Sequence, residues 1–149
     1  MNILIIENEI YLAQKVVSRL LDDGHSCDYI ESPNIDNLTK EYDTILLSTS
    51  LPAALCKNII KRYSENSIIL LLVSYISDET VTNPIKDGAK DYIMKPFIMD
   101  ELVRKIYHYK ECRSIRRELQ TLREYFNFTM AEIDTTDVLL PPSFPTLIE

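Results

Sequence analysis

Short, nearly continuous apolar runs recur along the chain and predict buried strands. Three of these runs are well defined, at residues 3–6, 44–47 and 68–73, and two shorter ones lie at residues 29–30 and 92–94. Runs of this length that are rich in Ile and Leu and do not alternate with polar residues are typical of parallel strands covered on both faces. The pattern therefore predicts a parallel sheet inside an α/β fold.

Segments with helical spacing separate these runs. Apolar residues recur three and four positions apart between residues 10 and 21, where Gly24 is placed for a left-handed helix cap, and again between residues 55 and 63. The predicted order is a strand followed by a helix, repeated five times. The right-handed crossover rule folds this order into a doubly wound, five-stranded parallel sheet.

The fourth predicted helix contains an irregularity at Asn83 and Pro84. A proline inside a helix removes a hydrogen bond and clashes with the preceding turn. We therefore expect this helix either to begin at Asn83, with Pro84 in its first turn, or to be short and irregular.

The last helix is predicted to run from about residue 99 to residue 126, beyond the end of the sheet. Its apolar residues first lie at 102, 106 and 109, and then slip around the helix axis. The second stripe consists of Cys112, Ile115, Leu119, Leu122 and Phe126. The face that carries residues 102, 106 and 109 can pack on the sheet, whereas the second stripe needs another surface to cover it. The second stripe spans roughly two heptads, which is too few to identify a coiled coil by pattern alone.

These patterns divide the chain into three predicted parts. Residues 1–110 form the α/β domain, residues 111–126 form a helical extension for dimerisation or signalling, and residues 127–149 form a linker or the start of an output segment. The last part holds three prolines and no basic residue, as expected for such a connection.

Composition agrees with a single globular domain. The chain has 149 residues, of which 46% are hydrophobic, and this is enough for one domain with a core. Its three cysteines are odd in number and form no CxxC pair, so neither a disulfide framework nor a zinc cluster is indicated. The first apolar run is too short for a membrane span, and we expect a cytoplasmic protein without membrane contact.

Charge is unevenly distributed within a net charge of −7. Residues 101–123 carry seven basic and three acidic side chains, although the chain is acidic on both sides of this segment. A basic segment of this kind is weak support for nucleic-acid binding, because solvated helices often have this composition. We expect DNA binding only through a segment beyond Glu149.

Polar residues follow four of the predicted strands. They are Glu7, Asn8 and Glu9 after the first, Ser48 after the third, Ser74 after the fourth and Lys95 after the fifth. The carboxyl ends of parallel strands meet at one edge of the sheet, where ligands bind in open α/β folds.

With these residues in place, the chain resembles the receiver domain of two-component response regulators over roughly residues 1–110. The most specific stretch is GAKDYIMKPF, which is similar to the family's last strand and Lys-Pro turn. The stretches YDTILLSTSLP and ILIIENE align with the family's third and first strands, but they carry different side chains at the functional positions. The resemblance implies a flavodoxin-like fold of the receiver type.

The resemblance also implies roles for individual residues. In the family, a strand-three aspartate accepts a phosphoryl group from a histidine kinase, an acidic pair after strand one holds Mg²⁺, and a strand-five lysine reaches the phosphoryl oxygens. The acidic pair becomes Glu7 and Asn8, the acceptor becomes Ser48, and the lysine is kept as Lys95. Tyr92 matches the family's switch aromatic, while a switch hydroxyl at Ser74 requires a shift of one residue.

Charge counting then predicts a pocket without phosphoryl chemistry. Standard pockets place several carboxylates against one lysine, whereas here Glu7 alone faces Lys95. Mg²⁺ dehydrates reluctantly and needs more than one anionic ligand. A serine cannot form an acyl phosphate, and no base is in frame to activate Ser48. We expect no metal, no cofactor and no enzymatic activity, and either a fixed cluster that holds one conformation or a decayed pocket that only supports the fold.

These inferences favour an atypical pseudo-receiver in two-component signalling that acts by protein contact, without phosphorylation. Its expected partners are a second copy bound through the 112–126 stripe and an output domain or partner regulator that controls transcription. The stripe has two other possible positions, against its own domain or against an output domain. The alternative functions are a receiver phosphorylated on Ser48, Thr49 or Ser50, and a stand-alone adaptor.

Overall fold

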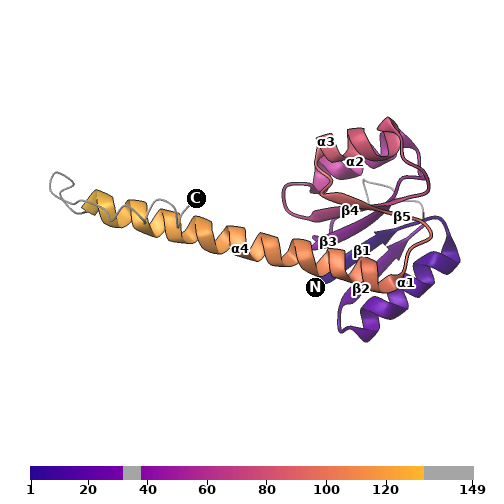
Figure 1. Cartoon of the computed structure of the whole chain (residues 1–149), viewed down its shortest axis with the longest axis horizontal. Coiled ribbons are helices and arrows are strands. Elements are labelled where there is room, and N and C mark those ends of the chain that lie inside the picture. The colour runs from indigo at the N-terminus through magenta and orange to yellow at the C-terminus, as the bar shows by residue number, and fades with distance from the viewer. Residues whose placement is uncertain (32–37, 133–149) are drawn as a thin grey trace. The chain divides into compact units, whose positions relative to one another are not determined.

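A computed structural model describes residues 1–31 and 38–132, with side chains up to residue 127 (Figure 1). The elements in chain order are β1 (Asn2–Ile6), α1 (Ile10–Asp22), β2 (Ser26–Ile30), β3 (Thr44–Ser48), α2 (Ala53–Tyr63), β4 (Ile68–Val73), the π-helical turn η2 (Asp78–Thr82), α3 (Asn83–Asp87), β5 (Asp91–Met94) and α4 (Met99–Glu132). The chain divides into two units, Met1–Tyr109 and Lys110–Glu149.

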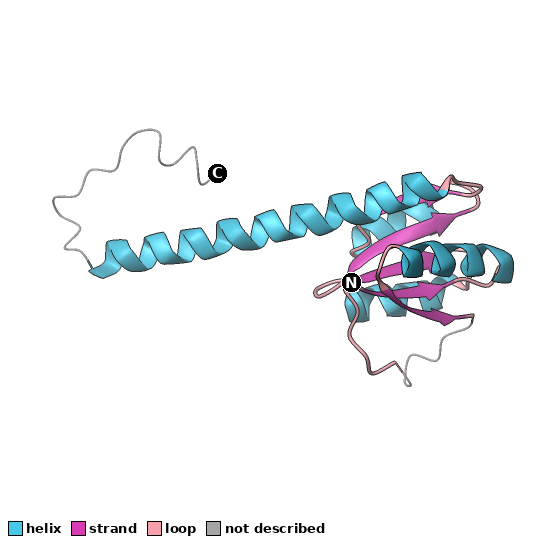
Figure 2. Cartoon of the chain, turned by 90° about the horizontal axis from the view of Figure 1, so that it is seen from below, coloured by secondary structure: helices cyan, strands magenta, loops and turns pink. Residues whose placement is uncertain are grey.

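The first unit is built on one parallel sheet with the strand order β2-β1-β3-β4-β5. Helices cover both of its faces (Figure 2). The predicted doubly wound, five-stranded parallel sheet is therefore confirmed, and so is the extended C-terminal helix.

The central strands are buried on both faces, which explains their uninterrupted apolar sequences. Side chains of a strand alternate between faces, so Ile3 and Ile5 pack with α1 and with Leu102 and Ile106 of α4. Leu4 and Ile6 pack on the opposite face with α2. Burial of each such side chain stabilises the fold by about 1.5–3 kcal/mol, so the sheet interior is the main source of stability.

The connection from β2 to β3 differs from the predicted strand–helix repeat. No helix is present in residues 38–43, and residues 32–37 lie outside the described part of the chain. Leu38 and Tyr42 are buried in the core, and the Tyr42 hydroxyl donates a hydrogen bond of 2.7 Å to Asp28 of β2. In its described part, residues 38–43, this connection is therefore a coil that packs on the sheet, and the rest of the predicted second helix lies outside the described residues.

The region around Pro84 follows the prediction. Helix α3 begins at Asn83, has Pro84 in its first turn and is only five residues long. The preceding turn η2 is held by a capping box, in which Thr80 N donates to Ser77 Oγ at 3.1 Å and Ser77 N donates to Thr80 Oγ1 at 2.9 Å. The proline is accommodated because it falls where a helix lacks its internal hydrogen bonds.

Asp91 joins the start of β5 to α4. Its Oδ2 accepts hydrogen bonds from Lys105 Nζ at 2.9 Å and from the Tyr109 hydroxyl at 3.0 Å. Lys105 Nζ also donates to the Tyr92 carbonyl at 2.9 Å. Burial opposes ionisation of Asp91, but these donors and the Tyr92 backbone N–H together hold its pKa below the usual value. The last helix is therefore fixed to the edge strand by charge-assisted hydrogen bonds.

Gly88 ends α3 with a φ of 135°, and its Cα lies close to the end of α2. A Cβ at this position would lie 2.6 Å from Ser64 Cβ and 2.9 Å from Ser64 Oγ. We predict that Gly88→Ala lowers the free energy of unfolding by about 2–4 kcal/mol, because backbone strain and overpacking both contribute. Urea denaturation followed by circular dichroism measures the change.

Gly24 provides the matched control, since its φ is 88° and a Cβ there would have no neighbour within 4 Å. Gly24→Ala should show only the conformational part, about 1–2 kcal/mol. Adding Ser64→Gly to the Gly88→Ala variant should recover part of its loss. Equal losses for the two glycine variants would contradict the contact with Ser64.

Candidate functional site

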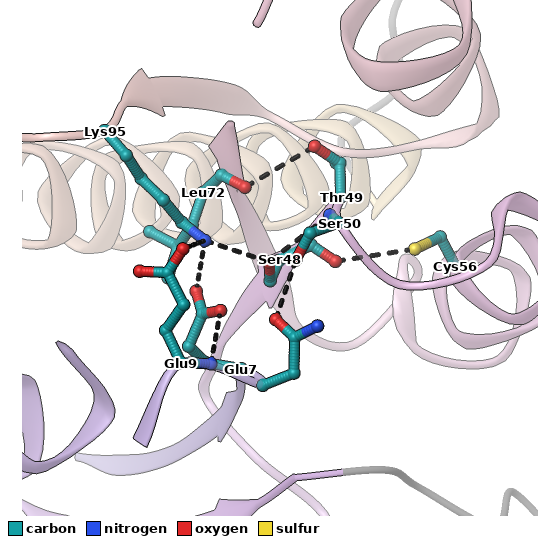
Figure 3. Close-up of polar contacts among 9 residues, drawn as sticks. Glu7, Glu9, Ser48, Thr49, Ser50, Cys56, Leu72 and Lys95 are labelled. Carbon is teal, nitrogen blue, oxygen red and sulfur yellow. Dashed lines mark hydrogen bonds and ion pairs between the residues drawn. The ribbon is translucent and has the colours of Figure 1, made fainter. Parts of the chain in front are cut away.

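Three side chains meet at the carboxyl edge of the sheet (Figure 3). Glu7 follows β1, Ser48 ends β3 and Lys95 follows β5. Lys95 Nζ lies 2.7 Å from Glu7 Oε2 and donates a hydrogen bond of 3.1 Å to Ser48 Oγ. The Glu7 side chain is fully buried and the Lys95 side chain is 8% exposed, so this is a buried ion pair held between three strand ends.

Ser48 is the centre of a directional hydrogen-bond chain. Its Oγ accepts from Lys95 Nζ and from Ser50 N at 3.3 Å. The Ser50 hydroxyl donates to Asn8 Oδ1 at 2.8 Å and lies 2.6 Å from Ser48 Oγ. Because the Ser50 proton is used on Asn8, the Ser48 proton points to Ser50. The Ser48 hydroxyl therefore donates to another hydroxyl, which is no base for activating a nucleophile.

The position of Glu9 shows that the predicted count of one carboxylate facing Lys95 is wrong. Its Oε1 lies 3.9 Å from Lys95 Nζ, so two carboxylates face the ammonium where one was predicted. The reason is local: Glu9 immediately precedes α1, and its backbone N–H donates to Glu7 Oε1 at 3.1 Å. The Glu9 side chain is 59% exposed, and exposed pairs contribute only about 0–1 kcal/mol. Among these three groups, the buried charges still balance.

The side-chain oxygens of Glu7 and Asn8, the two residues that the resemblance assigns to a magnesium ion, are already engaged. Glu7 Oε1 accepts from Glu9, and Asn8 Oδ1 accepts from Ser50. Glu7 Oε2 makes no well-aligned hydrogen bond to the described residues, and its partner is the Lys95 ammonium. Mg²⁺ prefers octahedral oxygen ligands with strong anionic character, so these residues do not fit that ion. The part of the chain with described side chains holds no group of three His, Cys, Asp or Glu residues placed to bind a metal ion.

The two switch positions lie outside this cluster. Ser74 is exposed and lines a neighbouring cavity of about 300 Å³ together with Thr49 and Ser50. Tyr92 is half-buried and packs against the core under α2. Its ring centroid lies 5.9 Å from Lys105 Nζ. The structure thus brings Glu7, Asn8, Ser48 and Lys95 together, and it does not bring Ser74 or Tyr92 to them.

Two neighbours of the cluster make contacts that the sequence did not predict. Ser50 links Ser48 to Asn8, as described above. Cys56 in α2 is buried, its Sγ lies 3.6 Å from the Ser48 carbonyl and 3.8 Å from the Leu51 carbonyl, and burial raises the pKa of its thiol to about 11. The serine run after the strand was a signal for Ser50, whereas nothing in the local pattern distinguishes Cys56 from a core residue.

The predicted dimerisation stripe lies on the part of α4 that belongs to the second unit. Ile115 and Leu122 are 49% and 53% exposed, respectively. Cys112, Leu119 and Phe126 are partly buried. The described residues contain no helix that is both long enough and apolar enough to cross a bilayer.

Sequence comparison finds relatives among transcriptional regulators, although no family model matches the chain. DltR of Streptococcus agalactiae is 33% identical over 113 residues, covering 71% of this chain and 50% of the relative. ArlR of Staphylococcus haemolyticus, a response regulator, is 36% identical over 112 residues, covering 70% and 50%. The chain therefore spans about half the length of these curated relatives.

Structural comparison finds the same class of protein. A two-component response regulator from Clostridium difficile is 26% identical with a TM-score of 0.61, covering 71% of this chain and 92% of that one. NtrX from Brucella abortus is 25% identical with a TM-score of 0.68, covering 81% of this chain and 29% of that one.

The buried ion pair yields a stability prediction. Lys95→Met keeps the aliphatic stem but leaves the Glu7 carboxylate buried without its partner, so the free energy of unfolding should fall by about 3–5 kcal/mol. Adding Glu7→Gln removes the orphaned charge and should recover most of that loss. Urea denaturation of both variants at neutral pH measures the coupling. A Lys95→Met protein within about 1 kcal/mol of the wild type would contradict a pocket held by this pair.

Proposed function

Because this chain carries a response-regulator receiver domain, we propose that it works as a receiver without phosphorylation, by protein contact in two-component signalling. The observation that supports this most strongly is the engagement of Ser48. A hydroxyl stands where the resemblance places the phosphoacceptor carboxylate, and it is hydrogen-bonded to the lysine that would otherwise meet the phosphoryl group.

The electrostatics of the pocket support the same proposal. Phosphoryl transfer depends on positioning and on neutralising the charge of the transferred group. The Lys95 ammonium is already neutralised by Glu7 at 2.7 Å, so an incoming phosphate would have to displace that carboxylate. Moving Glu7 out of contact would leave a buried charge unpaired, which is costly.

We propose further that the cluster holds one conformation permanently. It links the ends of β1, β3 and β5 through Glu7, Ser48 and Lys95. At β5, Lys105 contacts both the ring and the carbonyl of Tyr92, and these contacts would hold Tyr92 in place. A decayed pocket that only supports the fold is the competing view, and it requires the cluster to have no effect on partner binding.

The relatives supply the proposed setting. The matched region covers half the length of such a transcriptional regulator. We therefore propose that this chain controls an attached output domain or a partner regulator. A second copy bound through α4 is the proposed direct partner, and the cytoplasm is the proposed location. DNA contact would then belong to residues beyond Glu149.

A receiver phosphorylated on an unorthodox hydroxyl is the second candidate. Its support is the cavity of about 300 Å³ that Thr49 and Ser50 line. This cavity also includes Ala53, the first residue of α2, whose N-terminus has no side-chain cap. Backbone N–H groups at such a helix end favour anions, so a phosphorylated hydroxyl there would have donors nearby.

Incubation with acetyl phosphate and Mg²⁺, followed by intact-mass analysis, separates the two candidates. We predict that the wild-type chain gains no phosphate. The double variant Asn8→Asp and Ser48→Asp restores the carboxylates implied by the family and should gain a hydroxylamine-sensitive phosphate. Ser48→Asp alone is the intermediate control, because it restores the nucleophile without the second metal ligand.

A stable, hydroxylamine-resistant phosphate on wild-type Ser48, Thr49 or Ser50 would contradict our proposal. Such a product is an ester, since serine and threonine cannot form acyl phosphates. Single substitution of each hydroxyl by alanine would identify the modified residue.

A further inference from the structure

The second half of α4 carries its charges in a fixed relation to the apolar stripe. In a heptad repeat, Cys112, Leu119 and Phe126 occupy position a, and Ile115 and Leu122 occupy position d. The positions that flank this seam are e and g. Arg116 and Arg123 are the e residues, and Glu111 and Glu118 are the g residues before Tyr125. All four charged side chains are exposed, so one edge of the seam is acidic and the other is basic.

The spacing of these four charges in the sequence is not the spacing of ion pairs along one helix. Charges on a single helix stabilise each other when they lie three or four residues apart. The neighbours of Glu111 and Glu118 at those spacings are uncharged or histidine, and those of Arg116 and Arg123 include no acid. A solvated helix that used its charges for its own stability would place opposite charges at those spacings. The charges are instead complementary between g and the e position five residues later.

We propose that residues 111–126 form a parallel, in-register coiled coil with a second copy of this chain. This inference rests on the dimer of the proposed function and specifies its geometry. In a parallel pair, g of one helix faces e of the next heptad on the other. Glu111 would meet Arg116 of the partner subunit, and Glu118 would meet Arg123 of the partner subunit, twice each by symmetry.

The opposite orientation is disfavoured by the same residues. In an antiparallel pair, g faces g and e faces e, so glutamates would face glutamates and arginines would face arginines.

The half-exposed Ile115 and Leu122 supply apolar area for association, and the charges select the orientation. Residues 111–126 are only about 24 Å long, but α4 begins at Met99, inside the folded first unit. Helix nucleation is therefore already achieved before the stripe begins.

Cys112 provides a test of orientation that needs no added label. In the parallel register, the two Cys112 side chains share one a layer, so copper–phenanthroline should oxidise the two thiols to one disulfide with loss of two electrons and two protons. In the antiparallel register a residues pack against d residues, so Cys112 would lie opposite Leu122, about 15 Å along the helix from its equivalent. The full chain should therefore give a covalent dimer on non-reducing gels, and Cys112→Ser should abolish it although Cys27 and Cys56 remain.

Charge reversal tests the pairs themselves, by sedimentation of the full chain at low salt. E111K/E118K and R116E/R123E should each weaken self-association by about tenfold or more, because all flanking charges become alike. Combining all four substitutions should restore the dimer. K110E/R117E changes the net charge as much as R116E/R123E but lies on the face away from the seam, so it should leave the dimer intact.

The outcomes separate this inference from the proposed dimer. A monomeric wild-type chain throughout the micromolar range would overturn both. A wild-type dimer without the Cys112 disulfide, or one that tolerates E111K/E118K as well as K110E/R117E, would overturn the parallel register and leave a dimer through another surface.

Discussion

The buried ion pair between Glu7 and Lys95 is the interaction on which the site depends. Its nitrogen and oxygen atoms are 2.7 Å apart, and neither side chain has substantial exposure to solvent. Removing either partner would leave an uncompensated charge in the protein interior. The sheet edge is therefore closed around a neutral pair, and Ser48, hydrogen-bonded to the same ammonium, completes it. The buried part of this pocket has no unpaired charge that a divalent cation or a phosphoryl group would neutralise.

Charged groups are also paired where β5 meets α4. Asp91 binds Lys105 and Tyr109 of α4, and Lys105 also lies over the Tyr92 ring. A change in the position of the Tyr92 ring would have to break its contact with Lys105. These contacts are consistent with the proposed action by protein contact, and the acidic and basic edges of the stripe on α4 would select a second copy as the proposed partner.

The sheet could be predicted from the sequence because strands buried on both faces leave uninterrupted apolar runs, as 44–47 and 68–73 show. The coil before β3 could not, since Leu38 and Tyr42 are four residues apart, as in a helix, yet their burial depends on contacts with distant elements. Glu7, Ser48 and Lys95 were predictable as strand-end residues. The approach of Glu9 to Lys95 was not, because it depends on how the chain turns into α1.

Calorimetric titration of Mg²⁺, alone and with beryllofluoride, tests the neutral pocket most directly. The wild-type chain should give no saturable heat at millimolar Mg²⁺, because the oxygens of Glu7 and Asn8 are engaged and the buried charges of Glu7 and Lys95 cancel. Saturable uptake of Mg²⁺ or of beryllofluoride by the wild-type protein would show that the pair opens to admit an ion, and would contradict a receiver that works without phosphorylation.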